Sequence, residues 1–201
     1  MAGCVITIGR ETGSGGKTIG KAVAEKLGYD FYDRAAIAAI VSEKSGLSMD
    51  AVRKNIEQKT SSLLYDIYAQ TNVRPVDEDV YNIQSDVIKE LAEKGPCVIV
   101  GSCADYFLRD RENTLKVFVH APAAWRIDRI RRSGRADIST MTAGDLKKAD
   151  KTRAGYYEYF TFRKWGDKNN YDLSLNSSMG ISRAADLLAA AAAHFCDGEN
   201  K

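Results

Sequence analysis

The sequence predicts an α/β protein with a parallel β-sheet covered by helices on both faces. Short apolar segments rich in β-branched residues alternate with longer helical segments along the 201 residues, and this alternation is typical of a parallel sheet. The first such segment, residues 4–8, is apolar on both faces, as a central parallel strand is. A glycine-rich turn connects it to a helix. Ligands in such folds bind beyond the carboxyl ends of the strands.

The elements follow in a regular order. Five strands are predicted at residues 4–8, 29–33, 97–100, 115–121 and 171–175. The helix after the glycine turn ends at Gly28, and residues 34 to about 94 are predicted to be helical with breaks at Gly46 and at residues 72–75. This long helical block is an insertion between the second and third strands, and could form a substrate-binding flap. Further helices are predicted at residues 123–132, 141 to about 163, and 181–195.

Composition limits the classes of function. With 44% hydrophobic residues, 28% charged residues and a net charge of +2, the chain has the composition of an ordinary soluble globular protein. That charge implies no general attraction to nucleic acid or membranes. No segment is predicted to be a signal peptide or a membrane span, so we expect a cytoplasmic protein. Two histidines are too few for a zinc site.

The four cysteines show no C-x-x-C spacing. Cys4 and Cys97 each begin an apolar run. We therefore expect buried thiols of a reducing compartment rather than disulfides or metal ligands.

The segment GSGGKT has the composition of a phosphate-binding loop. Its glycines allow positive φ angles, so that successive N–H groups can form an anion-binding nest at the start of a helix. Lys17 adds a positive charge, and Thr18 adds a hydroxyl that suits magnesium. We interpret the segment as a phosphate site, against the alternative of a tight turn without a ligand. The candidate residues are Gly13, Ser14, Gly15, Gly16, Lys17 and Thr18.

The spacing of this loop is unusual. Glu11 stands six residues before Lys17, where the strict P-loop pattern has a glycine. The dinucleotide pattern G-x-G-x-x-G also fails, because Thr18 takes the place of its third glycine.

Five segments in chain order carry a resemblance to a known family. They read ITIGRETGSGGKTIGKAVAEKLGYDFYDRAAI, CVIVGSCADYFL, VFVHAPAAWRIDRI, ADKTRAGYYEYFTFRKWGD and YDLSLNSS. With them, nearly the whole chain resembles the cytidylate kinase-like family, relatives of bacterial CMP kinase.

The resemblance implies a three-layer α/β/α P-loop nucleoside-triphosphate-hydrolase fold of the nucleoside monophosphate kinase type. It implies ATP and Mg²⁺ as cofactors and nucleotides as substrates. In a single domain, residues of about 34–95 would bind the acceptor and residues of about 134–163 would form a lid. The core would then comprise residues 1–33, 96–133 and 164–201.

Two departures concern positive charges. In an ungapped alignment with the loop of true CMP kinases, Arg10 replaces the first glycine and Gly16 replaces the lysine, so that Lys17 falls one place later. The resemblance implies that GSGG is a trait of the cytidylate kinase-like relatives. Ser102 stands where the family usually has an arginine. Because phosphoryl transfer depends on positioning and on electrostatic stabilisation, both changes put the rate in doubt unless the loop brings Lys17 back to the phosphates.

Acidic residues follow two of the predicted strands. Asp33 closes the second strand and precedes Arg34. Asp33 suits an acceptor contact and equally suits the N-cap of the next helix, and both roles can hold at once. Asp105 lies past the third strand, where it is a candidate acceptor contact or Walker-type acid, with an N-cap or a surface charge as the alternative.

Arginines concentrate in the segment WRIDRIRRSGR. Arg129 and Arg132 share one face of the predicted helix, and arginine binds phosphate through two oxygens. A lid role, a solvated basic face in which Asp128 pairs with a neighbour, and nucleic-acid binding remain open. The absence of interleaved aromatic residues argues against the last.

The segment DKTRAGYYEYF places Arg153 three residues after Asp150. The resemblance makes Arg153 a transition-state clamp from the lid. The aromatic residues that follow are interpreted as packing rather than base stacking.

Together these residues predict magnesium-dependent transfer of the γ-phosphoryl group of ATP, with CMP or dCMP as the first acceptor. Lys17, Arg129, Arg132 and Arg153 would neutralise charge. Asp33, Arg34 and Asp105 would face the acceptor. Two alternatives stay open: a nucleotide-binding protein with little kinase activity, and a kinase for another small acceptor.

Overall fold

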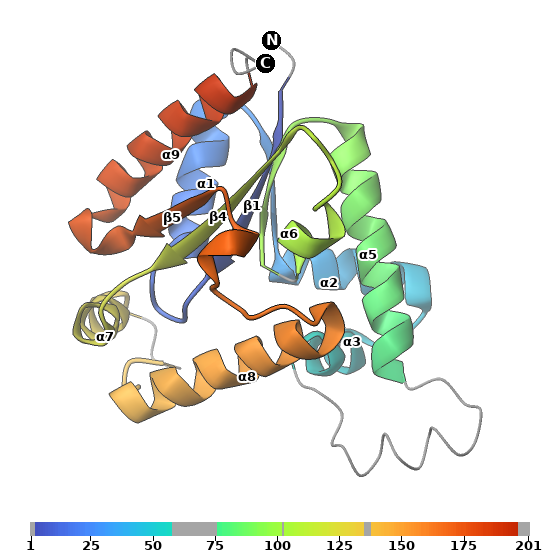
Figure 1. Cartoon of the computed structure of the whole chain (residues 1–201). Helices are drawn as coiled ribbons and strands as arrows, with labels where there is room; N and C mark the ends of the chain where they lie inside the picture. Colours follow the sequence, from blue (N-terminus) through green and yellow to red (C-terminus); the bar gives the residue numbers. More distant parts are fainter. Residues whose placement is uncertain (1–2, 58–75, 102, 135–137, 197–201) are drawn as a thin grey trace.

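A computed structural model of the chain describes residues 3–57, 76–101, 103–134 and 138–196. Its centre is a five-stranded sheet in the order β2-β3-β1-β4-β5, and every neighbouring pair is parallel. The predicted parallel α/β architecture is therefore confirmed (Figure 1). The strands are β1 (Val5–Arg10), β2 (Asp30–Asp33), β3 (Cys97–Val100), β4 (Thr114–His120) and β5 (Leu173–Asn176).

Helices follow the strands closely in sequence. The bounds of all five predicted strands lie within two residues of the observed ones, and the predicted break at Gly46 is the αL C-cap of α2. The predicted break at residues 72–75 falls outside the described residues, as do Ser102 and Arg135.

The helices are α1 (Gly16–Leu27), α2 (Arg34–Ser45), α3 (Met49–Glu57), α5 (Val76–Lys94), α6 (Ala104–Phe107), α7 (Ala123–Arg132), α8 (Ala143–Thr161) and α9 (Ile181–Cys196).

Two buried clusters cover the two faces of the sheet, because successive side chains of a strand point to opposite faces. Ile6 and Ile8 of β1 pack with α1 and α9, whereas Val5 packs with α2, α5 and α6. Figure 1 shows α1 and α9 on one side of the sheet and α5 and α6 on the other. The strand segments are apolar on both faces since both faces are covered.

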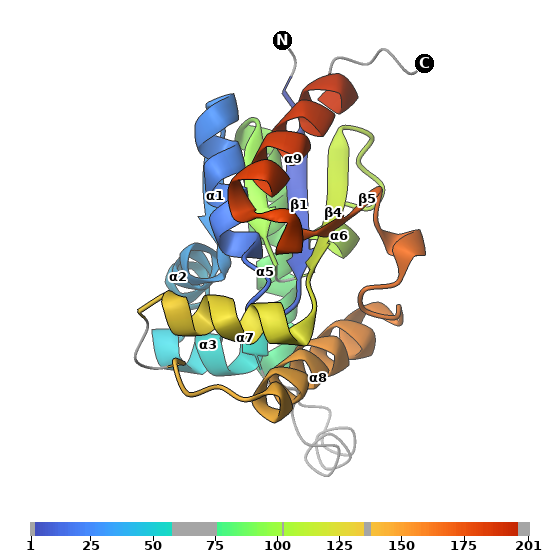
Figure 2. The ribbon, with the colours of Figure 1, turned by 90° about the vertical axis from the view of Figure 1, so that its left-hand side faces the viewer.

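The carboxyl ends of the strands meet a separate group of helices. α3, α7 and α8 lie beyond the end of the sheet that is opposite the chain termini (Figure 2). The turns that leave β1, β2 and β3 therefore open toward these helices. This arrangement places the glycine turn, Asp33 and Asp105 at one edge of the sheet, as expected for a ligand site.

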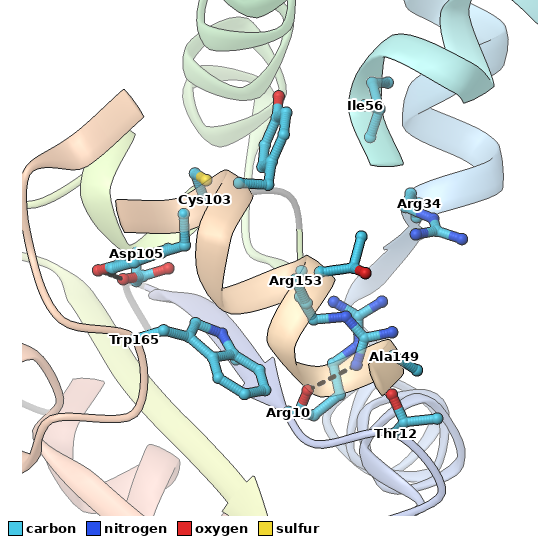
Figure 3. A pocket seen from close by; sticks show the side chains of 14 residues that line it. Arg10, Thr12, Arg34, Ile56, Cys103, Asp105, Ala149, Arg153 and Trp165 are labelled. Atoms are coloured by element: carbon cyan, nitrogen blue, oxygen red, sulfur yellow. Dashed lines mark hydrogen bonds between the residues drawn. The ribbon is translucent and has the colours of Figure 1, made fainter. Parts of the chain in front are cut away.

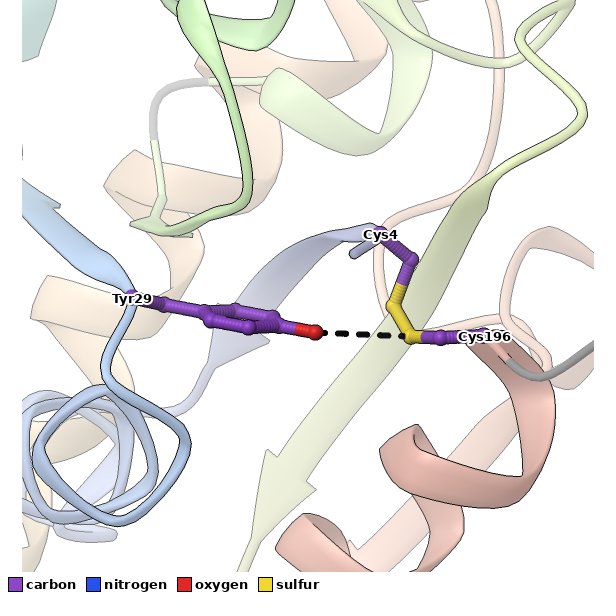
Figure 4. The surroundings of a disulfide bond; sticks show 3 residues. All are labelled: Cys4, Tyr29 and Cys196. Atoms are coloured by element: carbon purple, nitrogen blue, oxygen red, sulfur yellow. Dashed lines mark hydrogen bonds between the residues drawn. A yellow bond between two sulfur atoms is a disulfide. The ribbon is translucent and has the colours of Figure 1, made fainter. Parts of the chain in front are cut away.

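The expectation of a free thiol at Cys4 is wrong. Cys4, just before β1, forms a disulfide with Cys196 at the end of α9, across a sequence separation of 192 (Figure 4). The first strand begins and the last helix ends at the same end of the sheet, and the two Cα atoms lie 5.3 Å apart, within the range of a disulfide. Cys97 and Cys103 are buried thiols, as expected.

Candidate functional site

The glycine turn between β1 and α1 is tightly packed. Gly13 and Gly15 have φ angles of 79° and 87°, a region that favours glycine. A Cβ atom on Gly13 would lie 2.8 Å from Cδ1 of Ile130, and one on Gly15 would lie 2.4 Å from Cδ1 of Ile181. Gly15 caps α1 without a side-chain hydrogen bond. The first N–H groups of α1 therefore receive no side-chain acceptor from their own cap, as in an anion-binding helix terminus.

A buried ionic network fixes the start of the loop. Nη1 of Arg126 donates to Oδ2 of Asp150 at 2.6 Å and to the carbonyl oxygen of Thr12 at 3.0 Å. The N–H of Thr12 donates to the other carboxylate oxygen of Asp150 at 2.7 Å. Oε2 of Glu11 lies 3.5 Å from Nε of Arg126 and accepts from the N–H of Ala121 at 3.0 Å. The network joins the loop to α7 and α8.

Two further contacts hold the loop from either side. Nη1 of Arg153 on α8 donates to the carbonyl oxygen of Arg10 at 2.9 Å. The buried hydroxyl of Ser177 donates to the carbonyl oxygen of Ser14 at 2.6 Å. α8, the helix of the predicted lid, is thus in direct contact with the loop through Asp150 and Arg153.

Lys17 lies on the outer side of the loop. Its side chain is 67% exposed, and Nζ lies 2.5 Å from Oδ2 of Asp33. Asp33 also accepts from the N–H of Ala36 at 2.9 Å, so its predicted N-cap role is confirmed. Burial acts to raise the pKa of the Asp33 carboxyl, but the hydrogen bonds from Lys17 and Ala36 outweigh it, and the pKa is lowered overall.

The arginines of α7 divide between the loop and solvent. Nη2 of Arg129 donates to Oγ1 of Thr18 at 2.8 Å, and partial burial lowers the pKa of Arg129. Arg132 is exposed and pairs with Asp128 four residues earlier. The structure therefore brings Arg129 to the loop, and it gives Arg132 the solvated ion pair that one of the sequence interpretations described.

A cavity of about 290 Å³ lies next to the loop, beneath α8. Figure 3 shows Arg10, Arg34 and Arg153 on one side of it and Asp105 on the other, with Trp165 near the middle. Ile56 of the helical insertion lines it as well. The cavity therefore joins the end of β1, the insertion and the predicted lid.

The basic side of the cavity concentrates positive charge. Burial lowers the pKa of the Arg10 guanidinium well below its ordinary value, and the charges of Arg153 and Arg34 lower it further. Asp33 opposes this effect, but its carboxylate already holds Lys17. An anion in the cavity would relieve the mutual repulsion of the three guanidinium groups.

The opposite side of the cavity holds a protonatable acid. Asp105 is buried in α6, and Oδ2 accepts from the hydroxyl of Tyr157 at 2.7 Å. Burial raises the pKa of Asp105 from 3.8 to about 6, although the hydrogen bond from Tyr157 opposes the rise. The interpretations of Asp105 as an N-cap or a surface charge are wrong, because the carboxyl is buried and Cys103 is the N-cap of α6.

Sequence patterns do not indicate two features of this site. Arg10 stands in the sequence only as a replaced glycine, and the one clue to its role is a charged residue at the very end of a buried strand. Tyr156 and Tyr157 are buried, as expected of packing residues, but both line the cavity, and no local pattern indicates that Tyr157 pairs with Asp105. Trp165, at the end of the aromatic segment, lines the cavity as well.

Among the described residues, no group of three or more His, Cys, Asp or Glu side chains could hold a metal ion. Thr18 supplies a hydroxyl oxygen beside the loop, which fits Mg²⁺ because this ion takes most of its ligands from phosphates and water. No helix within the described part of the chain is long and apolar enough to cross a membrane.

Known proteins resemble this chain in sequence. Cytidylate kinases from Methanococcus aeolicus and Archaeoglobus fulgidus are 26% and 25% identical to it over 176 residues each. These alignments cover 87% of this chain and 88% of the first relative, and 86% of this chain and 84% of the second.

Solved structures share the fold. An uncharacterized protein from Eubacterium ventriosum has a TM-score of 0.70 at 24% identity, with 98% of this chain and 99% of that chain covered. A gluconokinase from Sinorhizobium meliloti has a TM-score of 0.59 at 15% identity, and a shikimate kinase from Bacteroides thetaiotaomicron has 0.55 at 17%. The alignment with the gluconokinase covers 97% of this chain and 94% of the gluconokinase. The alignment with the shikimate kinase covers 94% of this chain and 97% of the shikimate kinase.

The sequence profile of the cytidylate kinase-like family matches residues 5–179, which is most of the chain. The family and these relatives indicate a kinase of the nucleotide type, and the solved structures show the fold. The glycine loop at the carboxyl end of β1 and the arginine-lined cavity beside it thus have a common context: the chain belongs to the cytidylate kinase-like family.

Proposed function

We propose that this protein transfers the γ-phosphoryl group of ATP to the phosphate of a nucleoside monophosphate, with CMP or dCMP as the first acceptor. The observation that carries the proposal is the position of a cavity with three arginines beside a glycine loop at the carboxyl edge of a parallel sheet. Donor and acceptor sites must adjoin for direct transfer. The relatives named cytidylate kinase support the choice of acceptor.

On the donor side, the loop from Gly13 to Thr18 would hold the phosphates of ATP through backbone N–H groups and the start of α1. The hydroxyl of Thr18 would hold Mg²⁺ once the hydrogen bond from Arg129 is released. Mg²⁺ held there would neutralise part of the charge of the phosphates.

Positive side chains would neutralise the charge that develops in the transition state. Arg153 would do so from α8, where it contacts the end of β1 and lines the cavity. Arg129 lies at the loop, and Arg132 would join it when the segment of about residues 134–163 closes as a lid. Lys17 would reach the phosphates only after its ion pair with Asp33 opens.

On the acceptor side, the basic wall and the acidic wall of the cavity suit the two ends of a nucleotide. Arg34 would bind the acceptor phosphate, and Asp33 would face the acceptor once its ion pair with Lys17 opens. Asp105 would hydrogen-bond the base. A carboxyl with a pKa of about 6 donates a hydrogen bond when protonated and only accepts when ionised, so it can match a base that presents both donors and acceptors.

The chemical step needs no strong base. An oxygen of the acceptor phosphate forms a bond to the γ-phosphorus as the bond to the ADP oxygen breaks, and the products are ADP and a nucleoside diphosphate. The acceptor phosphate is already ionised and nucleophilic. The remaining task of the chain is to orient both nucleotides and to exclude water, and α8 across the loop serves both purposes.

The test is product formation. Purified protein is mixed with Mg²⁺-ATP and each nucleoside monophosphate in turn, and the products are separated by chromatography. We expect ADP and CDP in equal amounts with CMP. Formation of no diphosphate with any monophosphate would refute the proposal.

Lys17→Ala runs beside the wild type, with Lys21→Ala as the matched control. The two lysines lie on the same helix and have similar side-chain exposures of 67% and 65%. The proposed role for Lys17 predicts loss of activity in Lys17→Ala only.

A second candidate is a nucleotide-binding protein with little kinase activity. The ion pair between Lys17 and Asp33 favours it, because this pair holds the lysine nearest the loop away from the phosphates. Binding of ATP without ADP formation in the same experiment would support this candidate.

A further inference from the structure

We propose that Arg10 takes the place of the lysine that this loop lacks at position 16. Its guanidinium would bind the phosphoryl group that passes between loop and cavity, and Gly16 and Gly101 make room for its side chain. Its role in catalysis rests on the proposed phosphoryl transfer, whereas its anion binding does not.

Gly16 and Arg10 approach each other closely. A Cβ atom on Gly16 would lie 2.7 Å from Cβ and 2.9 Å from Cγ of Arg10. The Cβ atom of Arg10 is fixed by the backbone of the strand and cannot swing aside as the tip of a side chain can, so a contact of 2.7 Å to it requires a shift. A lysine at position 16 and an arginine at position 10 therefore exclude each other in this backbone.

The Arg10 side chain ends over Gly101. A Cβ atom on Gly101 would lie 1.7 Å from Nη1 of Arg10, so the guanidinium occupies the space over that glycine. Gly101 follows β3, and the N–H of Gly101 is bonded to the carbonyl oxygen of Ile8 in β1. The guanidinium thus lies between the carboxyl ends of two neighbouring central strands. Figure 3 shows it at the basic side of the cavity, beside Arg153 and on the same side as Arg34.

Other charged groups lie near the Arg10 guanidinium. In the part of the chain that the structure describes, no carboxylate lies within ion-pair distance of the Arg10 guanidinium. The nearby acid, Asp33, holds Lys17 instead. The positive charges of Arg34 and Arg153 act on Arg10 from the same space. A buried, planar group of this kind is suited to bind two oxygens of a phosphoryl group.

These contacts bear on two positions together. Position 16 lacks the lysine of the CMP kinase loop, and position 102 lacks the arginine that the family usually has. The Arg10 side chain starts beside position 16, and its charge ends against Gly101, next to position 102. One arginine on the end of β1 would supply the charge that both positions lack.

The test measures anion binding without nucleotide turnover. Inorganic tripolyphosphate is titrated into the full chain, and its dissociation constant is measured by calorimetry and by the rise in Tm. Arg10→Met keeps the aliphatic stem and removes the charge, and Arg111→Met is the control, because Arg111 is an exposed arginine next to the amino-terminal end of β4. We expect at least tenfold weaker binding in Arg10→Met and less than a twofold change in Arg111→Met.

A double-mutant cycle tests whether a lysine at position 16 can replace the arginine at position 10. We expect Gly16→Ala to weaken binding, because its Cβ displaces Arg10, and Arg10→Gly to weaken it at least tenfold. Arg10→Gly combined with Gly16→Lys should restore affinity to within about threefold of the wild type, whereas Gly16→Lys alone should not. Circular dichroism of each variant separates weak binding from loss of the fold.

Several results would overturn the assignment: wild-type affinity in Arg10→Met, no detectable tripolyphosphate binding by the wild type, or no recovery in a folded double variant. If Arg10 binds tripolyphosphate but no monophosphate is phosphorylated, the proposed function fails and the assignment of Arg10 as an anion-binding residue stands. If Arg10→Met forms CDP at the wild-type rate, the function stands and the catalytic role of Arg10 fails.

Discussion

Replacing Asp105 by asparagine should change how the stability of this protein depends on pH. The carboxyl is buried, and its pKa rises from 3.8 to about 6 in the folded chain. Between these two pH values the folded chain holds a proton on Asp105 that the unfolded chain has released. The contribution of Asp105 to the unfolding free energy should therefore be fully present below pH 3.8 and should be lost as the pH rises through about 6.

The size of the effect follows from the shift. A rise of about two pKa units corresponds to about 3 kcal/mol of unfolding free energy. Asparagine has nearly the shape of a protonated carboxyl and does not titrate in this range. We therefore expect the difference in unfolding free energy between Asp105→Asn and the wild type to change by about 3 kcal/mol in favour of the variant between pH 3 and pH 8.

Urea denaturation at half-unit pH steps measures this difference, and contributions of other groups cancel in it. Tyr157→Phe is the informative companion, because the hydrogen bond from Tyr157 lowers the pKa of Asp105. Its removal should extend the window to higher pH. A difference between Asp105→Asn and the wild type that stays constant across the range would refute the assignment of a raised pKa to Asp105.

Two further substitutions test the network and the disulfide. Asp150→Ala should lower the unfolding free energy by about 3 kcal/mol, because it leaves the Arg126 side chain, only 9% exposed, without its 2.6 Å partner. Asp128→Ala removes an exposed ion pair and should lower the unfolding free energy by less than about 1 kcal/mol in the same urea titration. Equal losses in the two variants would contradict this reasoning. Reduction of the disulfide between Cys4 and Cys196 should lower the unfolding free energy by about 2–5 kcal/mol, since it releases a very long loop in the unfolded chain. Cys4→Ser should have this lower unfolding free energy both with and without reductant. A wild type whose unfolding free energy does not change with reductant would show that the disulfide does not stabilise the fold.

The strands were predictable because each is a short run of apolar and β-branched residues, buried on both faces. The turn between β1 and α1 was predictable as well, since clustered glycines between a strand and a helix allow the positive φ angles of a tight turn. Asp33 shows the limit of such patterns. Its N-cap role follows from its place before a helix, but its ion pair with Lys17 depends on how the helix after the loop lies against the end of β2.

The disulfide and the cavity were beyond sequence reasoning for a common physical reason. Cys4 and Cys196 are joined across 192 residues, and Asp105 and Tyr157 across 52. Each pair depends on packing between elements that are distant in sequence, and a single sequence does not encode such pairs in any local periodicity. The course of Arg10 is similar. Its residue type is visible, but its direction is set by the space over Gly16 and Gly101.

The bond between Cys4 and Cys196 also gives the chain the topology of a ring. All the strands and helices described above lie between these two cysteines, so the backbone from β1 to α9 is a closed circuit. One proteolytic cut inside it leaves a single covalent molecule, heavier by one water, and two fragments separate only after reduction. Because Cys4 and Cys196 are adjacent in space, the protein is suited to circular permutation. A short linker would join the segments that flank these two cysteines, and the chain would be opened at another surface turn without a change in the sheet or its ligand edge.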